Sequence, residues 1–318
     1  MTVGVLVMAY GSASGPDDVE RYYTDIRGGR PPSPAHLAEL LERYAAIGNR
    51  FPLLDITRAQ AAGLERALNT NGAVRFKTYL GMKHSPPSIA EALAAIRRDG
   101  VERAVGIVMA PHWSAMSIET YVERVEKSVA EEGGPEFNFV RSFHDHPAFV
   151  ELLASRVDYA LGRLGGDGVT VVFSAHSLPV RALGDGSLRC LRCDACSDGC
   201  RYEGGLRATA DLVAARVGLV SYTTAWQSAG RTSDSWWGPS LEDAIRDLVT
   251  AGNRGVVVCA AGFVADHLEI LYDLDVEARE VAEGAGMRFE RTEMPNADPR
   301  FSEVLAAVVR EHLAGRAP

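Results

Sequence analysis

The chain has 318 residues, enough for two domains at about 150 residues each, and its 33 basic and 42 acidic residues give a formal net charge of −9. Hydrophobic residues make up 47% and charged residues 24%, the ordinary proportions of a globular protein with a sizeable core. The acidic balance argues against a nucleic-acid partner, and no apolar run approaches the roughly 18 residues of a transmembrane helix. The opening stretch Val3–Met8 is typical of a first strand rather than a signal peptide, so we expect a cytoplasmic protein.

Short Val-rich runs alternate with amphipathic stretches along the whole chain. The expected strands are Val3–Met8, Val74–Leu80, Ala104–Met109, Val169–Phe173, Val217–Tyr222, Gly255–Cys259 and Met287–Phe289. The expected helices are Ala35–Ile47, Thr57–Leu68, Ser88–Arg98, Ser117–Ala130, Ala148–Leu161, Leu206–Ala215, Leu241–Ala251, His267–Ala282 and Ser302–Leu313. Unbroken apolar strands alternating with helices predict an α/β fold with parallel sheets. Ser88 and Ser240 are expected helix N-caps, and a domain boundary is expected near 133–135 or 162–168.

Polar side chains follow five of the expected strands, where ligands of open α/β sheets bind. They are Tyr10, His84, His112, His176 and His267. A neutral imidazole at such a rim can bind a metal or take a proton, although a histidine that only orders its loop remains an alternative. Neither G-x-G-x-x-G after the first strand nor G-x-x-x-x-G-K-[ST] is present, which disfavours NAD and ATP chemistry.

Three carboxylates recur at four-residue intervals in one expected helix. Glu269, Asp273 and Glu277 stand at i, i+4 and i+8, so a helix places them on one face. Like charges at this spacing destabilise a helix slightly. The pattern indicates either a solvated acidic face or a path for a cation.

Four of the five cysteines fall in a C-x2-C-x2-C-x3-C run: Cys190, Cys193, Cys196 and Cys200. Zinc sites with four thiolates usually consist of two separated C-x2-C hairpins, whereas a compressed run is closer to iron–sulfur usage. Arg201 stands where a proline often follows the last cysteine. We therefore favour an iron–sulfur cluster, with structural zinc or free thiols as alternatives. Cys259 ends an apolar run and is expected to be a buried strand residue.

Several segments together resemble the ferrochelatase family over nearly the whole chain. The most specific are SAHSLP at Ser174–Pro179 and GFVADHLEILYD at Gly262–Asp273. Supporting segments are Trp226–Ser228, Trp237–Pro239 and Met294–Asn296. The stretches Val7–Gly11, Glu20–Arg27 and Arg43–Gly48 look like the monofunctional bacterial branch that metallates coproporphyrin III.

This resemblance implies two Rossmann-like domains, each a four-stranded parallel sheet flanked by helices, with the porphyrin between them. The expected domains span residues 1–145 and 146–299, and a C-terminal helix of about 300–318 packs back on the first. The cysteine segment 187–205 lies in the second domain, where it replaces a shorter Asp-Pro-Tyr stretch, and it looks like the [2Fe-2S]-binding segment of some bacterial members.

The resemblance also implies residue roles. His176 and Glu269 match the catalytic positions, and the metal-binding set is His176, Glu269, Asp273 and Glu277. The porphyrin-binding set is Tyr10, Arg27, Arg43, Tyr44, His84 and Tyr121. Phe51 departs from the family, which often carries Ser at this position, near one propionate.

The expected activity is therefore insertion of Fe(II), as substrate, into coproporphyrin III to give coprohaem in haem biosynthesis. Alternatives are a protoporphyrin IX ferrochelatase and, less favoured, a cobalt chelatase acting on sirohydrochlorin. A different class is an iron–sulfur redox or iron sensor, or a haem carrier, without chelatase activity. Because metal insertion moves no electron, the cluster is expected to act as a structural staple or sensor. We expect a monomer, and the resemblance allows peripheral contact with a membrane.

Overall fold

The computed structural model describes residues 2–70, 74–184, 186–193, 196, 199–230 and 232–315. The strands are β1 (Thr2–Ala9), β2 (Arg75–Met82), β3 (Arg103–Val108), β4 (Glu136–Val140), β5 (Val169–His176), β6 (Pro179–Ala182), β7 (Leu188–Cys190), β8 (Tyr222–Gln227), β9 (Ser235–Trp236), β10 (Gly255–Cys259) and β11 (Arg288–Arg291). The helices are η1 (Pro16–Asp18), α1 (Val19–Ile26), α2 (Pro34–Ala46), α3 (Leu53–Leu68), α4 (Ile89–Arg98), α5 (Ile118–Glu132), α6 (Pro147–Leu164), α7 (Arg201–Val217), α8 (Leu241–Thr250), α9 (Leu268–Leu271), η2 (Asp273–Ala278), α10 (Arg279–Gly284) and α11 (Pro299–Leu313).

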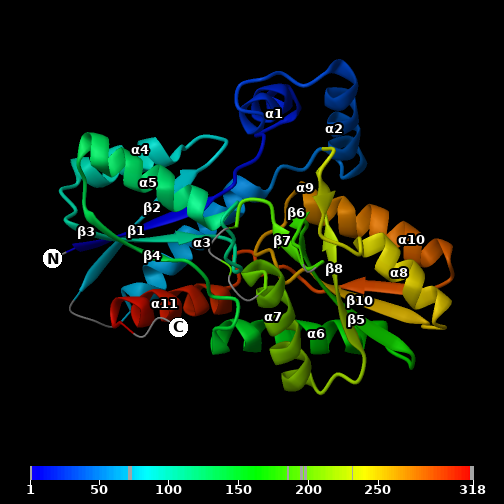
Figure 1. The fold of residues 1–318 in the computed structure, drawn as a ribbon. Helices are drawn as coiled ribbons and strands as arrows, with labels where there is room; N and C mark the ends of the chain where they lie inside the picture. Colours follow the sequence, from blue (N-terminus) through cyan, green and yellow to red (C-terminus); the bar gives the residue numbers. More distant parts are fainter. Residues whose placement is uncertain are drawn as a thin grey trace.

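Two parallel four-stranded sheets form the body of the molecule, in the orders β2-β1-β3-β4 and β11-β10-β5-β8 (Figure 1). Their central strands are buried on both faces, as the unbroken apolar runs predict. One apolar cluster runs through both sheets, from Leu6 on β1 to Phe173 on β5. The predicted α/β fold with four-stranded parallel sheets flanked by helices is confirmed.

Helices cover both faces of each sheet. In the first sheet, α4 and α5 lie on one face, and α3 lies on the other with α11 beside it (Figure 1). In the second, α6 packs against α7, and α8 packs against α10. Helix α11 contacts α3, α6 and β4, so the end of the chain returns to the first sheet. The last residues of the expected C-terminal helix, 316–318, lie outside the described residues.

Local sequence signals explain several helix starts. Ser88 and Ser240 accept the backbone N–H groups of Glu91 and Asp243, as predicted for N-caps. The Glu91 side chain also accepts the Ser88 N–H, which completes a capping box. Cys259 is buried in β10, as predicted, and burial raises the pKa of its thiol to about 12.

One expected strand lies elsewhere in the structure, and several strands have no counterpart among the expected ones. The run 217–222 was expected to be a strand, but Val217 ends α7 and Gly218 caps it with φ +78°, so strand β8 begins at Tyr222. Strand β4, at a sheet edge, begins with exposed and half-buried residues and is buried only at Phe139 and Val140, so it lacks an apolar run. The expected helix 267–282 is divided into α9, η2 and α10, and η2 is a π-helix.

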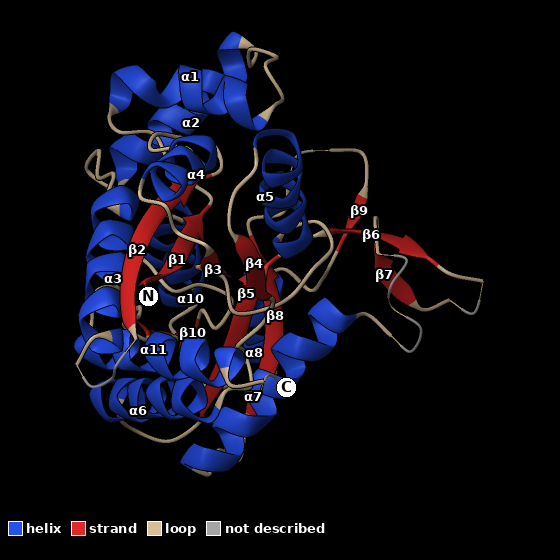
Figure 2. Cartoon of the chain, turned by 90° about the vertical axis from the view of Figure 1, so that its left-hand side faces the viewer, coloured by secondary structure: helices blue, strands red, loops and turns tan. Residues whose placement is uncertain are grey.

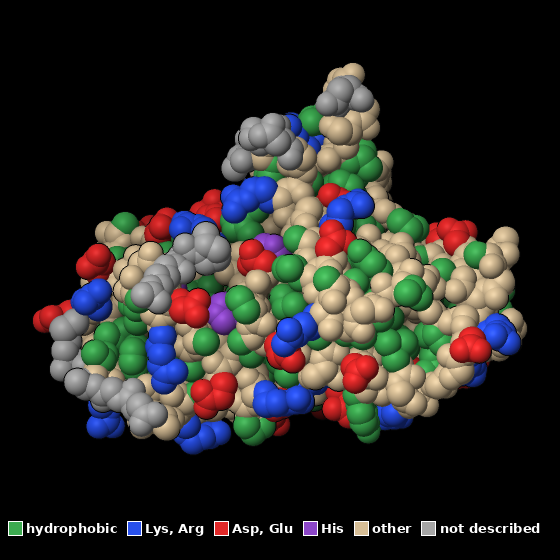
Figure 3. Space-filling view, turned by 90° about the horizontal axis from the view of Figure 1, so that it is seen from below, with side chains coloured by type: hydrophobic (Ala, Val, Ile, Leu, Met, Phe, Trp, Pro, Cys, Tyr) green, Lys and Arg blue, Asp and Glu red, His purple; other side chains and the backbone are tan. Residues whose placement is uncertain are grey.

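A small antiparallel sheet, β7-β6-β9, stands outside the two main sheets (Figure 2). It carries Cys190 at the end of β7. On the face of the molecule in Figure 3, basic and acidic side chains are interspersed. Within the described residues, no helix is long and apolar enough to cross a membrane.

Candidate active site

The connection order of the second sheet places its ligand-binding position between β5 and β10. The chain leaves β5 toward β8 on one side and continues from β10 toward β11 on the other. Loops diverge at such a reversal of strand order, and ligands of open α/β sheets bind there. His176 is the last residue of β5, and Glu269 follows β10 in α9.

A close backbone approach brings these two segments together. Gly262, after β10, donates its N–H to the Ser174 carbonyl at 3.0 Å. A Cβ atom on Gly262 would lie 2.8 Å from the Ala175 Cα, so only glycine fits against β5 here. Gln227 on β8 donates to the Glu269 carbonyl at 3.0 Å, which secures the start of α9 on the same sheet.

Glu269 lies between two imidazoles. His176 Nε2 is 3.5 Å from one carboxylate oxygen of Glu269, and His267 Nε2 is 3.4 Å from the other. The Nδ1 atoms contact the carbonyls of Ser177 at 2.5 Å and Ala265 at 2.9 Å. Because a carbonyl can only accept, each Nδ1 carries a proton, and each Nε2 is directed to the carboxylate.

This arrangement separates the pKa values of the group. Burial lowers the pKa of His176, but the charge and hydrogen bond of Glu269 outweigh it and raise that pKa to about 9. Burial raises the pKa of Glu269, yet pairing with both histidines holds it well below its usual range. The pKa of His267 is raised, because the contacts with Glu269 outweigh burial. At neutral pH the Glu269 carboxylate is therefore ionised and bonded to an imidazolium. A divalent cation can take the place of that imidazolium charge beside the carboxylate.

The three carboxylates Glu269, Asp273 and Glu277, here called the acidic line, run from α9 along the π-helix η2. The Glu277 N–H bonds to the Tyr272 carbonyl five residues back, and this wider turn brings residues four apart closer to one face. Asp273 is 3% exposed and accepts the Ser228 hydroxyl. Burial and the charge of Glu269 raise the pKa of Asp273 to about 7, against the lowering effect of Ser228 and Arg43.

Arg43 on α2 approaches the acidic line from the first half of the chain. Its guanidinium lies 3.9 Å from Asp273, 3.5 Å from Glu277 and 4.7 Å from the centre of the Tyr272 ring. A porphyrin propionate at Arg43 would therefore compete with two carboxylates. Helices α1 and α2 pack on α9 and η2 through an apolar cluster that includes Tyr44 and Leu271.

Tyr10 and His84 follow the neighbouring strands β1 and β2 of the first sheet. Their rings are 4.6 Å apart, and His84 Nδ1 lies 2.6 Å from Asp25. Tyr10 is 44% exposed, and burial together with the charges of Glu269 and Asp25 raises its pKa.

The remaining expected porphyrin-binding residues lie in different surroundings. Arg27 is exposed at the end of α1, with its guanidinium 5.8 Å from the centre of the Tyr23 ring. Tyr44 is 2% exposed and stacks on Phe51 at 4.3 Å, and Tyr121 is 3% exposed. Both tyrosine side chains are therefore almost inaccessible in this structure. Phe51, the residue at which the sequence was expected to depart from the family, stacks on Tyr44.

Lys83 is a candidate that the sequence analysis did not single out. Its Nζ lies 2.6 Å from the Thr120 hydroxyl and 4.9 Å from the centre of the Tyr121 ring. Burial and nearby Arg124 lower its pKa to about 8. The signal available in the sequence was its position next to His84, directly after β2.

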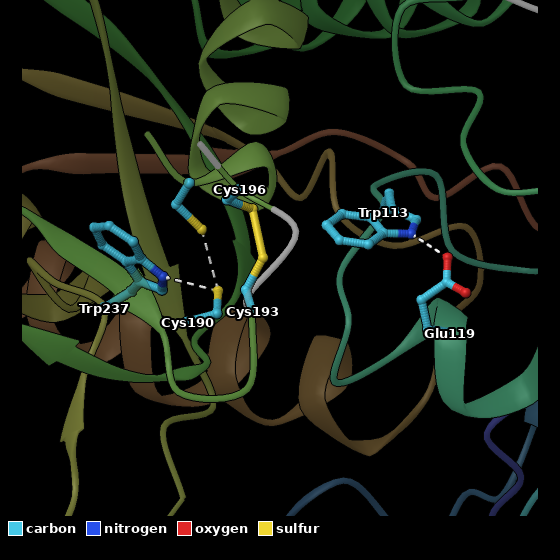
Figure 4. The surroundings of a disulfide bond; sticks show 7 residues. Trp113, Glu119, Cys190, Cys193, Cys196 and Trp237 are labelled. Atoms are coloured by element: carbon cyan, nitrogen blue, oxygen red, sulfur yellow. Dashed lines mark hydrogen bonds between the residues drawn. A yellow bond between two sulfur atoms is a disulfide. The ribbon is translucent and has the colours of Figure 1, made fainter. Parts of the chain in front are cut away.

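All four cysteines of the C-x2-C-x2-C-x3-C run are buried beside the start of α7 (Figure 4). Cys193 and Cys196 form a disulfide, while the sulfurs of Cys190 and Cys200 lie 3.2 Å apart. Contact with Cys190, together with backbone N–H groups of α7, lowers the pKa of Cys200 to about 6. Among the described residues, no group of three or more His, Cys, Asp or Glu side chains is arranged to hold a metal ion.

Comparisons with known proteins agree with this architecture. The sequence matches the ferrochelatase family over residues 2–313. It is 41% identical over 315 residues to coproporphyrin III ferrochelatase of Halalkalibacterium halodurans, covering 98% of this chain and 97% of the relative. Its identity to the coproporphyrin III ferrochelatase of Listeria monocytogenes is 40% over 314 residues, covering 97% of each.

Two solved structures share the fold at low sequence identity. The sirohydrochlorin chelatase SirB from Bacillus subtilis subspecies spizizenii, in complex with cobalt, has a TM-score of 0.59 at 9% identity, covering 99% of this chain and 97% of that chain. CbiX, described as the terminal enzyme of siroheme biosynthesis in denitrifying bacteria, has a TM-score of 0.54 at 15% identity, covering 96% and 98%. These likenesses support the fold alone.

Proposed function

The chain belongs to the ferrochelatase family, and on this premise we propose that it inserts Fe(II) into coproporphyrin III to give coprohaem, a step of haem biosynthesis. Relatives about 40% identical over nearly the full chain are coproporphyrin III ferrochelatases, which supports this substrate over protoporphyrin IX. The observation that carries the proposal is the pair His176–Glu269 at the reversal point of the second sheet, next to the acidic line. We assign to His176 and Glu269 the catalytic roles.

The reaction must strip water from Fe(II) and remove two protons from the pyrrole nitrogens. An imidazole with carboxylates suits ferrous iron, and His176, Glu269, Asp273 and Glu277 supply that set. In the resting protein, His176 carries a proton held by Glu269. Iron arriving at Glu269 replaces that positive charge and lowers the pKa of His176.

Once its Nε2 proton has passed to the carboxylates of Glu269 and Asp273, the neutral imidazole has only Nε2 free, because Nδ1 is already bonded to the Ser177 carbonyl. Nε2 can then either bind the iron or accept a pyrrole proton, and it cannot do both at once. Asp273, with a pKa of about 7, can take up and release a proton near neutral pH. Glu277 continues the line beside Arg43. This sequence of groups gives the released protons a route away from the porphyrin.

We assign the porphyrin contacts to Tyr10, Arg27, Arg43, Tyr44, His84 and Tyr121, and the two halves of the chain, 1–145 and 146–299, to two domains that hold the porphyrin between them. The cytoplasmic location and monomeric state predicted from the sequence belong to the same proposal. Coproporphyrin has four propionates, and cationic side chains such as Lys83 at this face suit them.

The test is His176→Ala, assayed anaerobically with Fe(II) and coproporphyrin III. Turnover should be abolished while porphyrin binding, measured by fluorescence, stays near the wild-type level. His36→Ala, at an exposed histidine of α2, is the matched control and should behave as wild type. Normal turnover by His176→Ala would remove its assigned role, and a wild-type protein that binds porphyrin without metallating it would be a carrier.

We propose further that the cysteine segment holds a [2Fe-2S] cluster through Cys190, Cys193, Cys196 and Cys200. The segment supplies four buried sulfurs in two pairs, Cys190–Cys200 at 3.2 Å and the Cys193–Cys196 disulfide, and the α7 amides favour a thiolate at Cys200. All four could serve as ligands only after a thiol reductant has converted that disulfide to two thiols. A four-thiolate zinc site is the alternative. When bound, a cluster would cross-link the segment and could hold one electron, which metal insertion does not require.

Visible absorbance of anaerobically purified protein tests the cluster. Cys193→Ser should bleach the absorbance, whereas Cys259→Ala, at a buried cysteine of β10, should leave it unchanged. A colourless wild-type protein that contains zinc would establish the alternative. An unchanged spectrum in Cys193→Ser would rule out ligation by that thiol.

A further inference from the structure

The chain on both sides of the four cysteines returns to the proposed catalytic histidine, His176. The chain leaves His176, runs through β6 and β7 to Cys190, passes the other cysteines and enters α7 directly after Cys200. The second residue of α7 is Tyr202, and its hydroxyl donates to the His176 carbonyl at 2.9 Å. The Tyr202 hydroxyl therefore links the first turn of α7 directly to the backbone of His176.

A second set of contacts joins the same two places. Trp237 donates its ring N–H to the Cys190 sulfur at 3.4 Å (Figure 4), and its backbone N–H to the Leu178 carbonyl at 3.1 Å. The Ser177 hydroxyl donates to the Trp237 carbonyl at 2.8 Å. The two residues that follow His176 are thus held by a tryptophan that also contacts a cysteine.

The ring of Tyr202 is held by packing as well as by the hydrogen bond of its hydroxyl. The side chain is 7% exposed, and its ring lies 5.5 Å from that of Trp226, which in turn stacks on Trp237. Next to it in α7, Arg201 lies 4.2 Å from the centre of the Trp113 ring, which follows β3 in the first sheet. The start of α7 is therefore fixed by the cysteines on one side and by the first sheet on the other.

We propose that Tyr202 is a positioning residue for His176. We propose also that the bonds made by the four cysteines, whether to one another or to a metal centre, change the rate of iron insertion through the Tyr202 hydroxyl. The inference rests on the proposed function of His176. Displacing Cys200 shifts the first turn of α7, and this shift releases the His176 carbonyl. The imidazole then loses its fixed direction toward Glu269, while the porphyrin-binding surface is left as it was.

The first experiment is Tyr202→Phe, which keeps the ring and removes only the donor. Loss of one hydrogen bond should lower kcat by roughly three- to tenfold, with an unchanged KM for coproporphyrin III and unchanged cluster absorbance. Tyr222→Phe is the matched control, since its hydroxyl donates to Asp211 at 2.9 Å on the far end of α7. An unchanged kcat in Tyr202→Phe, or an equal fall in both variants, would overturn the proposal.

Nitrogen-15 NMR of labelled histidines gives a readout that does not depend on activity. The His176 signal, identified by its loss in His176→Ala, should broaden or split in Tyr202→Phe and stay single in Tyr222→Phe. An unchanged signal would contradict the positioning role, even if stability fell. If the wild-type protein fails to metallate coproporphyrin, the proposed function fails, while this spectrum still decides the role of Tyr202.

A double-mutant comparison tests the link to the cysteines. Cys200→Ser should lower kcat in the wild-type background and have little further effect in Tyr202→Phe. Should Cys200→Ser not fold, Cys193→Ser takes its place. Independent, multiplicative effects of the two substitutions would show that the cysteines do not act through Tyr202.

Discussion

Asp273→Asn should make the protein more stable and less active. Asp273 is 3% exposed, and burial next to Glu269 raises its pKa from 3.8 to about 7. The folded state therefore holds the proton more tightly than the unfolded state, and stability falls as the pH rises from about 4 to about 7. At about 1.4 kcal/mol per pH unit, the charged carboxyl costs about 4 kcal/mol above pH 7. Asparagine removes this cost and can still accept the Ser228 hydroxyl.

Urea unfolding at pH 8 and pH 4.5 measures the effect. Asp273→Asn should raise the free energy of unfolding by up to about 4 kcal/mol at pH 8 and by only about 1 kcal/mol at pH 4.5, while Fe(II) insertion slows. Asp275→Asn is the contrast: its carboxylate pairs with Arg291 at 2.7 Å, so its loss should destabilise. A gain that is equal at both pH values, or no gain at pH 8, would refute the assigned cost of the Asp273 charge.

Two further predictions concern the pairing of His176 with Glu269 and the hydrogen bonds of Gln60 to the second half of the chain. Glu269→Gln should lower the pKa of His176 from about 9 by at least about one unit, because the carboxylate that holds the proton is gone. A histidine NMR titration without metal measures this pKa, and an unchanged value would show that Glu269 does not hold the His176 proton. Gln60, 1% exposed on α3, donates to the carbonyls of Val264 and Asn296 at 2.9 and 3.0 Å. Gln60→Leu leaves both carbonyls without this donor and should lower the free energy of unfolding in urea by roughly 1–3 kcal/mol; equal stability would show that these bonds contribute nothing.

The fold class followed from the sequence because buried parallel strands are apolar along their whole length. The strands at 3–8, 104–109 and 255–259 were recognisable on that basis, and the residues after them lie at the sheet rims. The edge strands β4 and β8 begin with exposed residues and become buried only toward their carboxyl ends, and they were missed or misplaced. The edge strands β2 and β11 were nevertheless recognised, so partial exposure weakens the apolar signal of an edge strand without always hiding it.

In the site, too, some features could be predicted from local sequence and others could not. Position after a strand identified His176, and four-residue spacing identified Glu269, Asp273 and Glu277. The partnership of His267 with Glu269 depends on the backbone path after β10, and the π-helix depends on hydrogen bonds to residues five back. Tyr202 contacts His176 across 26 residues of chain, a closure that no local pattern encodes.

The most direct test of the account is a side-by-side assay of the purified, anaerobic protein with Fe(II) and either coproporphyrin III or protoporphyrin IX. The change from porphyrin to haem absorbance reports insertion. We predict preferred turnover of coproporphyrin III. Preferred turnover of protoporphyrin IX would contradict the substrate, and metallation of neither by an intact protein would contradict the chelatase function.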